Sequence, residues 1–585
     1  MTVLTDVPVR TLIDDLLAEQ QSLTAVERFA QKHERQLFPQ QARYFRQLIP
    51  LNQPAPGEQY AFAVDLDACT GCKACVSACH SLNGLDEDEV WRNVGMIHGG
   101  DSAAPYQQTV TTACHHCLEP ACLDGCPVRA YEKDQITGIV RHLDDQCIGC
   151  QYCVLKCPYD VPKYSHRKGI VRKCDMCSSR LAADEAPACV QACPTSAISI
   201  RIVARDQLAA SFTDSSRMLP GAFPSNYTQP TTTYVTRKPM PANARAGDGL
   251  ALRLEHAHWP LIWMLLLTQT SAGMYLALAG LVGFAPAVFA FGAMPLTIAA
   301  FVLLNLGLAV SVLHLGKPLG AWRAFLGLRT SWMSREIFAF SAFAAAAGAL
   351  TFSSAWPQIT KLWPAMRKME GWIQPAAFSP ALTLITAVLA LAGVFCSAMI
   401  YIDTRRSFWA HSLTSVRFFG TMLLLGVAGT AAVLACWQAF TGALLAEAIR
   451  SFAIAATIIR TALFGWEALN FRQALSDSTD PNHFSALTLW KLRRPLLRTS
   501  LALFVCSTTS GLLTITESGW FGMACATLSF ALSFASQTVE RYCFFAAVVA
   551  PRMPGSFAPS SGPAIQFAAP HQSPLGKDRR SWFRR

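Results

Sequence analysis

The sequence predicts two joined parts of different fold class, a cysteine-rich α+β domain followed by an all-α bundle of eight transmembrane helices. Sixteen of the 21 cysteines fall between Cys69 and Cys193, and charged residues become scarce after about Glu255. From His256 to Gly316 the chain has no Asp, Glu, Lys or Arg, and this span is long enough for two membrane helices of about 20 residues each. At 585 residues the chain is also too long for one domain.

Residues 1–58 are expected to form a helical extension. Apolar side chains recur at near-helical spacing between Thr11 and Gln31, which is typical of an amphipathic helix. We expect this helix to pack on the rest of the chain rather than on a partner. The N-terminus lacks the apolar segment of a secretory signal and carries charges at Arg10 and Asp14, so no export signal is predicted.

Residues 59–204 contain four cysteine quartets of the kind that binds iron–sulfur clusters. The first and third have the spacing C-x2-C-x2-C-x3-C of bacterial ferredoxins, in which three thiolates surround one cluster and the fourth ligates a partner cluster. A proline follows the second, third and fourth quartets and fixes φ where the chain changes direction. The quartets are Cys69, Cys72, Cys75 and Cys79; Cys114, Cys117, Cys122 and Cys126; Cys147, Cys150, Cys153 and Cys157; and Cys174, Cys177, Cys189 and Cys193.

Two other uses of cysteine fit these quartets less well. Disulfides require an oxidising compartment, and C-x2-C pairs are too local to cross-link a domain of this size. Zinc ribbons use two C-x2-C pairs for each metal ion and do not need further cysteines in phase with a proline. The repetition of the motif therefore favours iron–sulfur clusters.

Short β patterns lie beside the quartets at Tyr60–Leu66, Gly138–Leu143 and Ile198–Val203. Because the first and fourth quartets flank the second and third, we predict a double ferredoxin-like domain, with one unit inserted inside the other. Residues 205–254 are rich in Pro, Ser, Thr and Ala, and are predicted to be a linker to the bilayer.

Residues 255–545 are predicted to form the membrane bundle. Two helices occupy His256–Gly316, with a turn at Gly283–Pro295. Most of the apolar spans lack the polar face that a core helix of a soluble protein would show. The six further membrane spans are about Met333–Ala355, Pro380–Ile402, Ser415–Gln438, Gly442–Trp466, Thr499–Thr516 and Gly519–Val539.

Residues 546–585 are predicted to be a disordered basic tail that touches acidic lipid headgroups.

At the cysteine motifs the sequence resembles the iron–sulfur subunit of dimethyl sulfoxide reductase and its relatives among the molybdopterin oxidoreductases. The resemblance implies four [4Fe–4S] clusters, because the third quartet keeps all its cysteines. It also implies a row of clusters whose Cys69 end faces a catalytic subunit and whose Cys147 end faces the membrane. The matching segments are Cys69-Thr-Gly-Cys72-Lys-Ala-Cys75, Cys114-His-His-Cys117, Pro120-Ala-Cys122, Cys147-Ile-Gly-Cys150, Lys173-Cys174-Asp-Met-Cys177 and Cys193-Pro194-Thr195.

The same resemblance implies how the ligands are shared. The first three cysteines of one quartet join the last cysteine of a partner quartet. The implied sets are Cys69, Cys72 and Cys75 with Cys193; Cys174, Cys177 and Cys189 with Cys79; Cys114, Cys117 and Cys122 with Cys157; and Cys147, Cys150 and Cys153 with Cys126.

The membrane part resembles the anchor subunit of the same reductases, so the whole sequence resembles a fusion of two subunits. This resemblance implies that His314 and Glu336, with Arg335 beside them, bind and oxidise menaquinol or ubiquinol. Imidazole and carboxylate groups can accept the protons that quinol releases. The structural alternative is that His314 caps a helix and Glu336 pairs with Arg335. The matching segments are His258-Trp-Pro260, Thr268-Gln-Thr-Ser-Ala-Gly273, His314-Leu-Gly-Lys-Pro318 and Ser334-Arg-Glu-Ile337.

The net charge of +11 is predicted to orient the protein in the membrane rather than to bind nucleic acid. Loops on the N-terminal side of the helices carry twelve Lys and Arg residues, whereas the opposite loops carry only Lys361, Arg367 and Lys368. The positive-inside rule then places the cluster domain on the cytoplasmic face of the bacterial inner membrane. The alternative is the outer face, reached with the export signal of a partner. The twelve Lys and Arg residues of the loops on the N-terminal side are Lys317, Arg323, Arg329, Arg335, Arg405, Arg406, Arg417, Arg472, Lys491, Arg493, Arg494 and Arg498.

Together these observations predict an electron-transfer and anchor subunit. Quinol from the quinone pool would be oxidised near His314, and electrons would pass through the clusters to a molybdopterin-binding catalytic subunit. No segment reads as a pterin or substrate pocket, so the terminal chemistry is expected on that other subunit. Two alternatives remain: the reverse flow, from a formate-type dehydrogenase to quinone, and a scaffold whose clusters only stabilise the fold.

Overall fold

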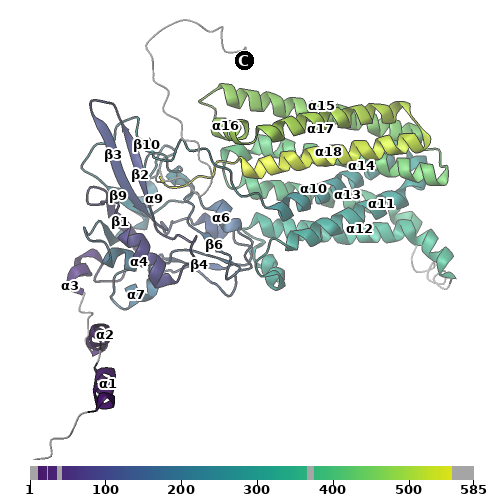
Figure 1. Ribbon diagram of the computed structural model, residues 1–585. Helices are drawn as coiled ribbons and strands as arrows, with labels where there is room; N and C mark the ends of the chain where they lie inside the picture. Colours follow the sequence, from purple (N-terminus) through teal and green to yellow (C-terminus); the bar gives the residue numbers. More distant parts are fainter. Residues whose placement is uncertain (1–10, 23, 36–41, 365–374, 556–585) are drawn as a thin grey trace, which may run out of the picture.

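The computed structural model describes residues 11–22, 24–35, 42–364 and 375–555, and places the cysteine-rich domain at one end of a helical bundle (Figure 1). In the cysteine-rich domain, β1 (Glu58–Asp65) pairs antiparallel with β8 (Ile198–Ala204), which joins the two ends of the domain. This pairing encloses the second and third quartets between the first and fourth. The predicted double ferredoxin-like arrangement and its three strands are therefore present.

Short helices and hairpins carry the quartets. A second sheet has the order β10–β2–β3, and two hairpins, β4–β5 and β6–β7, complete the domain. The strands are β2 (Asn93–Gly100), β3 (Pro105–Thr112), β4 (Tyr131–Lys133), β5 (Val140–His142), β6 (Lys163–Ser165) and β7 (Ile170–Arg172). The helices are α4 (Ala74–Asn83), α5 (Ala121–Asp124), α6 (Tyr152–Lys156), α7 (Ser178–Ala182), α8 (Ala188–Gln191) and α9 (Arg205–Ala210).

The N-terminal region differs from the expected single packed helix. It forms α1 (Leu12–Gln21) and α2 (Ala25–Arg35), and then α3 (Ala42–Phe45) with the short 3-10 helix η1 (Arg46–Leu48). Thr11 and Asp14 form a capping box that starts α1. No residue of α1 is buried. The apolar residues of α1 therefore do not pack on the described part of this protein, contrary to the expectation. Among the described residues of this region, Phe45 and Ile49 enter the core of the cluster domain.

The segment 205–254 is more than the extended linker that its composition predicted. Its strand β9 (Thr233–Val235) adds in parallel to β1, and β10 (Arg245–Ala246) pairs with β2. Thr231 also bonds twice to His115 O. Three- and two-residue edge strands are too short to leave a periodic signal, which is why the sequence did not reveal them.

Eight helices of the described residues are long and apolar enough to span a membrane, and all eight predicted spans correspond to one of them. The predicted turn at Gly283–Pro295 is wrong in length, because only Ala285 separates the first two helices and Pro295 lies inside the second. The helices are α10 (Trp259–Phe284), α11 (Pro286–Val312), α12 (Trp332–Leu362), α13 (Pro375–Ile402), α14 (His411–Thr441), α15 (Ala446–Ser476), α17 (Arg494–Thr516) and α18 (Gly519–Ala546).

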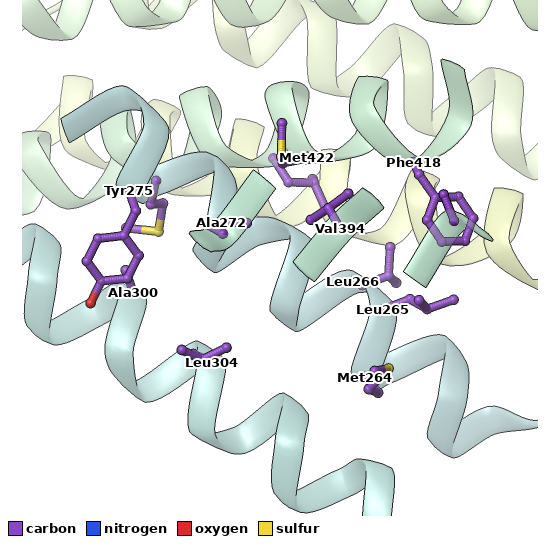
Figure 2. Close-up of a cluster of buried hydrophobic side chains, with 14 of the residues drawn as sticks. Met264, Leu265, Leu266, Ala272, Tyr275, Ala300, Leu304, Val394, Phe418 and Met422 are labelled. Atoms are coloured by element: carbon purple, nitrogen blue, oxygen red, sulfur yellow. The ribbon is translucent and has the colours of Figure 1, made fainter. Parts of the chain in front are cut away.

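The bundle is organised around α10 and α14, which are the most buried of the eight helices. Figure 2 shows Leu265 and Leu266 of α10 near Phe418 and Met422 of α14. At Gly273 the two helices approach so closely that an added Cβ would lie 2.0 Å from the carbonyl oxygen of Met422. Small residues permit such contact between membrane helices, where lipid supplies no hydrophobic driving force.

Three connections of the bundle lie on the side of the cluster domain. They contain the 3-10 helix η3 (Pro318–Gly327) between α11 and α12, the 3-10 helix η5 (Ser407–Trp409) between α13 and α14, and α16 (His483–Leu492) between α15 and α17. A further 3-10 helix, η2 (Ser225–Tyr227), belongs to the segment before the bundle. These three connections contain most of the positively charged loop residues.

The polypeptide returns to the cluster domain after α18. Gly555 N donates to Asp248 Oδ1 at 2.9 Å, and Met96 N donates to Gly555 O at 3.1 Å. Arg552 pairs with the same Asp248 at 3.1 Å. Residues 547–555 are thus ordered, contrary to the prediction of a tail disordered from residue 546. The rest of that predicted tail, residues 556–585, lies outside the described residues.

Candidate functional site

The cysteine loops share one backbone design. Gly71 and Gly149 occupy the same place in the first and third quartets and have φ of +73° and +72°. The residues two positions later, Lys73 and Gln151, are both left-handed and begin α4 and α6. The tight left-handed turns bend three successive cysteines around one point, and each following helix carries the fourth away.

The fold brings the last cysteine of each quartet beside a different quartet. All sixteen thiols are free of disulfides, and the neighbouring thiols are close enough to interact electrostatically. Those neighbours are Cys75 with Cys193, Cys79 with Cys177 and Cys189, Cys117 and Cys122 with Cys157, and Cys126 with Cys147, Cys150 and Cys153.

Four cysteines from two quartets share one cavity. Cys114, Cys117 and Cys122 line it together with Cys157, which belongs to the third quartet. Four thiolates around one cavity suit a [4Fe–4S] cluster, which takes four cysteine ligands.

Backbone amides point at several of the sulfurs. Ala130 N donates to Cys126 Sγ at 3.2 Å and Ala197 N to Cys193 Sγ at 3.2 Å. Both amides lie four residues after a cysteine that precedes a proline, so the Cys-Pro turn aims them. Such hydrogen bonds stabilise negative charge on thiolate ligands and tune cluster potential.

The membrane bundle holds the second and third quartets directly. In the α11–α12 connection, Gly327 N donates to Pro127 O at 2.9 Å and Ser331 Oγ to Gly125 O at 2.7 Å. Gly316 packs against Gly169, where an added Cβ would lie 2.0 Å from the carbonyl oxygen of Gly169. The helix connections of the bundle are therefore fitted closely to the turns that follow the second and third quartets.

A second set of contacts joins α6 to the α13–α14 connection. Lys156 Nζ pairs with Asp403 Oδ2 at 2.6 Å, with the lysine side chain only 5% exposed. Tyr152 OH donates to Ile400 O at 3.2 Å, and Arg406 Nη2 donates to Leu155 O at 3.1 Å. Helix α6 contains Cys153 and is followed at once by Cys157, so these bonds fix two cysteines relative to the bundle.

A cavity of about 420 Å³ lies between the cluster domain and the bundle. This volume is within the usual range of small-molecule sites. Its walls come from the cysteine loop after Gly149, from the start of α10, from the end of α11 and from the segment after α18. The ionisable residues of the lining are Cys150, Cys157, Asp160, Tyr164, His166, Glu255, His256, His258, His314 and Arg406.

His314 presents one free nitrogen atom. Its Nδ1 bonds to Ser311 O, and because a carbonyl only accepts, Nδ1 carries the proton. Nε2 is therefore an acceptor, and it is buried without a hydrogen-bond partner among the described residues. Burial lowers the pKa of His314, which favours the neutral imidazole. The side chain is thus prepared to accept a hydrogen bond from a ligand hydroxyl.

Glu336 and Arg335, which the sequence grouped with His314, do not line this cavity. Glu336 is 7% exposed and lies near Tyr152 and Tyr401. Arg335 donates to Leu328 O and Arg329 O and stacks on Trp332. No ion pair joins Glu336 to Arg335 in the part of the protein that the structure describes, so the two side chains face different neighbours.

His256 and His258 were not placed in the candidate site from the sequence. The His256 and His258 rings are 4.9 Å apart at an angle of 73°, and burial, followed by His256 and His314, lowers the pKa of His258 to about 4. The missed signal was their position: they immediately precede the first membrane helix, which starts beside the cluster domain.

Comparison with known proteins agrees with both parts of the molecule. Residues 106–202 match the 4Fe-4S dicluster domain family, and residues 254–546 match the family described as DMSO reductase anchor subunit (DmsC). The second match covers half of the sequence.

Individual relatives resemble the cysteine-rich part. The B subunit of the anaerobic dimethyl sulfoxide reductase of Haemophilus influenzae is 35% identical over 182 residues, which are 30% of this sequence and 87% of the relative. The B subunit of the same reductase from Escherichia coli is 38% identical over 148 residues, 24% of this sequence and 72% of the relative. The formate dehydrogenase-O iron-sulfur subunit of E. coli is 34% identical over 158 residues, 24% of this sequence and 52% of the relative.

Proposed function

Because this protein belongs to the DMSO reductase family, as a fusion of an iron–sulfur subunit with a DmsC-type anchor, we propose that it oxidises quinol in the cavity between its two parts. The electrons then pass to a molybdopterin-binding catalytic subunit, which is a separate polypeptide. The anchor and its eight apolar helices make the protein a multi-pass membrane protein.

The observation that carries the proposal is the position of His314 Nε2. This atom is buried and unpartnered among the described residues, and its side chain lines the same cavity as Cys150 and Cys157. A quinol headgroup bound there would touch a proton acceptor and lie beside two cluster ligands. Its isoprenoid tail would extend along the bundle, whose outer surface is apolar.

Sixteen cysteines are proposed to hold four [4Fe–4S] clusters. Numbered by the quartet that supplies three of the ligands, the first set is Cys69, Cys72, Cys75 and Cys193; the second is Cys114, Cys117, Cys122 and Cys157; the third is Cys147, Cys150, Cys153 and Cys126; and the fourth is Cys174, Cys177, Cys189 and Cys79. The proximity of the last cysteine of each quartet to another quartet supports this assignment. Bound clusters supply carriers that accept and release one electron at a time.

Quinol oxidation releases two electrons and two protons. His314 Nε2 accepts the first hydroxyl proton, and His258, within electrostatic reach of His314, accepts the second. Glu336 remains a proposed proton acceptor, but it is not among the residues that line the cavity, and it lies near Tyr152. Arg335 supports this region by holding the loop carbonyls before α12.

The test is His314→Gln in the complex with its catalytic partner. We expect at least a tenfold loss in the rate at which menaquinol or ubiquinol reduces the clusters, because Gln cannot take up the proton. Reduction by dithionite, which bypasses the cavity, should be unchanged. Glu336→Gln should have a smaller effect. A His314→Gln protein with normal quinol-driven reduction would contradict the proposal and favour a scaffold role.

The reverse flow is a second candidate, favoured by the similarity to the formate dehydrogenase-O iron-sulfur subunit. In that case the catalytic partner would deliver electrons to quinone in the same cavity. Midpoint potentials of the clusters, compared with that of the quinone couple, distinguish the two directions. Clusters that all lie well below the quinone couple would favour the dehydrogenase direction.

A further inference from the structure

We propose that two buried cations, Lys173 and Arg92, raise the reduction potentials of the clusters between which they lie. The inference rests on the proposed cluster sites but not on the quinol cavity. It assigns a role to two side chains that ligate nothing and that lie away from the membrane bundle. Cluster potential responds to local charge, so a buried positive group favours the reduced, more negative state.

Lys173 lies between two cysteine sets. It is 2% exposed, and its Nζ donates to Cys174 O at 2.8 Å, to Val140 O, and to Cys114 Sγ at 3.5 Å. Its strongest charge neighbours are the thiolates of Cys114 and Cys122 on one side and Cys174 on the other. The ammonium group therefore touches the second cysteine set and faces the fourth.

Arg92 lies between the first and fourth cysteine sets. It is also 2% exposed and stacks 4.7 Å above the ring of Phe62. Its Nη1 donates to Thr111 Oγ1 at 3.2 Å, and that oxygen lies 3.5 Å from Cys75 Sγ. Its charge neighbours come from the first and fourth cysteine sets, with Cys189 and Cys75 foremost.

Neither cation has a carboxylate partner among the described residues. Asp175, the acidic neighbour of Lys173, uses its oxygens to accept from Cys177 N and Ser178 Oγ at the start of α7. A buried charge without a counterion is costly, and persists when other charges compensate it. The thiolates, with the clusters they bind, are the compensating charges here.

The adjacent residue shows the contrast. Arg172 is nearly as buried as Lys173, but it forms an ion pair with Glu89, which is also buried. Lys156 near the membrane end is likewise paired, with Asp403. Their charges are largely cancelled, so their effect on the clusters should be small. Of these four cations, the two that face two cysteine sets are the two without a carboxylate.

Between the second and third sets, which are nearest the membrane, the described residues include no buried cation that lacks a carboxylate partner. There the buried residue between Cys122 and Cys153 is Tyr131, which is neutral. Cys150 of the third set and Cys157 of the second set both line the quinol cavity, and the two uncompensated cations lie beyond the third set. Higher potentials at the sets beside Lys173 and Arg92 draw electrons from the third set into the domain, which favours flow from quinol toward the Cys69 end.

The test is a redox titration of the complex, with chemical mediators, followed by electron paramagnetic resonance. We expect Lys173→Met, which keeps the length of the side chain and removes its charge, to move one cluster signal to lower potential. At a potential that half-reduces this cluster in the unmodified protein, the reduced fraction should fall severalfold. Lys173→Arg, which keeps the charge, should leave the potential of this cluster close to that of the unmodified protein.

The matched control is the double variant Glu89→Gln with Arg172→Gln, which removes a buried ion pair beside Lys173 without changing the net charge. It should leave all potentials unchanged. Arg92→Gln is the second test, and it should lower the reduction potentials of the clusters in the first and fourth sets. Iron and acid-labile sulfide content establish that all clusters are assembled.

Three results would overturn the inference. The first is unchanged potentials in fully loaded Lys173→Met and Arg92→Gln proteins. The second is an equal shift in Lys173→Met and Lys173→Arg. The third is loss of clusters in both neutral variants but not in the ion-pair control, because the two cations would then be structural. Mediators bypass quinol, so none of these results depends on His314.

Discussion

At the scale of single residues, chemistry follows from what a side chain lacks. His314 has one nitrogen fixed by Ser311 O and one left as an acceptor facing a cavity. Lys173 and Arg92 have hydrogen bonds but, among the described residues, no carboxylate to cancel their charge. In our proposals, quinol meets the first of these requirements and the negatively charged clusters meet the second.

The buried histidines give a pH prediction. Burial lowers the pKa of His258 to about 4 and also lowers that of His314, so both rings stay neutral at pH values where an ordinary histidine is already charged. The initial rate of cluster reduction by excess quinol should therefore not fall as the pH is lowered through the ordinary histidine pKa of about 6.5. Stopped-flow absorbance measures it. A rate that halves near the ordinary histidine pKa of about 6.5 would show that these rings titrate normally.

At the scale of elements, the contact of α10 with α14 limits what the bundle tolerates. Gly273→Val should lower stability by about 2 kcal/mol or more, because its side chain would overlap the backbone of α14. Thermal unfolding in detergent measures this change.

Gly280→Val is the matched control for that substitution. It lies on the same helix, with no atom within 4 Å of an added Cβ, and the change in helix propensity from glycine to valine is the same at both positions. Equal destabilisation of the two variants would show that the close contact is not important for stability.

Long apolar helices and repeated cysteine motifs could be predicted because each carries its signal locally. All eight spans follow from hydropathy, and β1 and β8 from alternation. The same local view placed a turn across Pro295, although a proline early in a membrane helix can be accommodated by its neighbours. It also missed β9, since a three-residue strand exists only because β1 offers it an edge.

The candidate site could be predicted only in part, because a sequence motif is local whereas a cavity is formed by residues far apart in the sequence. A short motif identified His314, but the cavity forms only where residues near 150, 256, 314 and 548 meet. Sequence spacing placed Glu336 beside His314 because both lie near the same ends of adjacent helices. It could not show that the two side chains face different neighbours.

At the scale of the whole molecule, the position of the charged connections bears on energy conservation. The three connections on the side of the cluster domain carry most of the positive loop charge, and the positive-inside rule makes this an argument for our proposal of a cytoplasmic cluster domain in a bacterial inner membrane. Quinol protons would then be released on the same side as the clusters.

This arrangement predicts electroneutral turnover when the terminal reduction also takes place on that side. Proteoliposomes containing the complex should develop no membrane potential during quinol oxidation, as measured with a voltage-sensitive dye. An added ionophore should not change the rate. Acidification of the compartment opposite the clusters would contradict this orientation of the quinol site.

The polypeptide crosses from cluster domain to bundle before α10 and returns after α18 to Asp248. The polypeptide therefore links the cluster domain to the bundle both by the covalent connection before α10 and by the contacts with Asp248 after α18. These two links hold the proposed quinol cavity beside the cysteine sets. A single proteolytic cut before α10 would leave the contacts of the returning segment intact. The proposed quinol site and the cluster site next to it are thus present in equal numbers in every molecule.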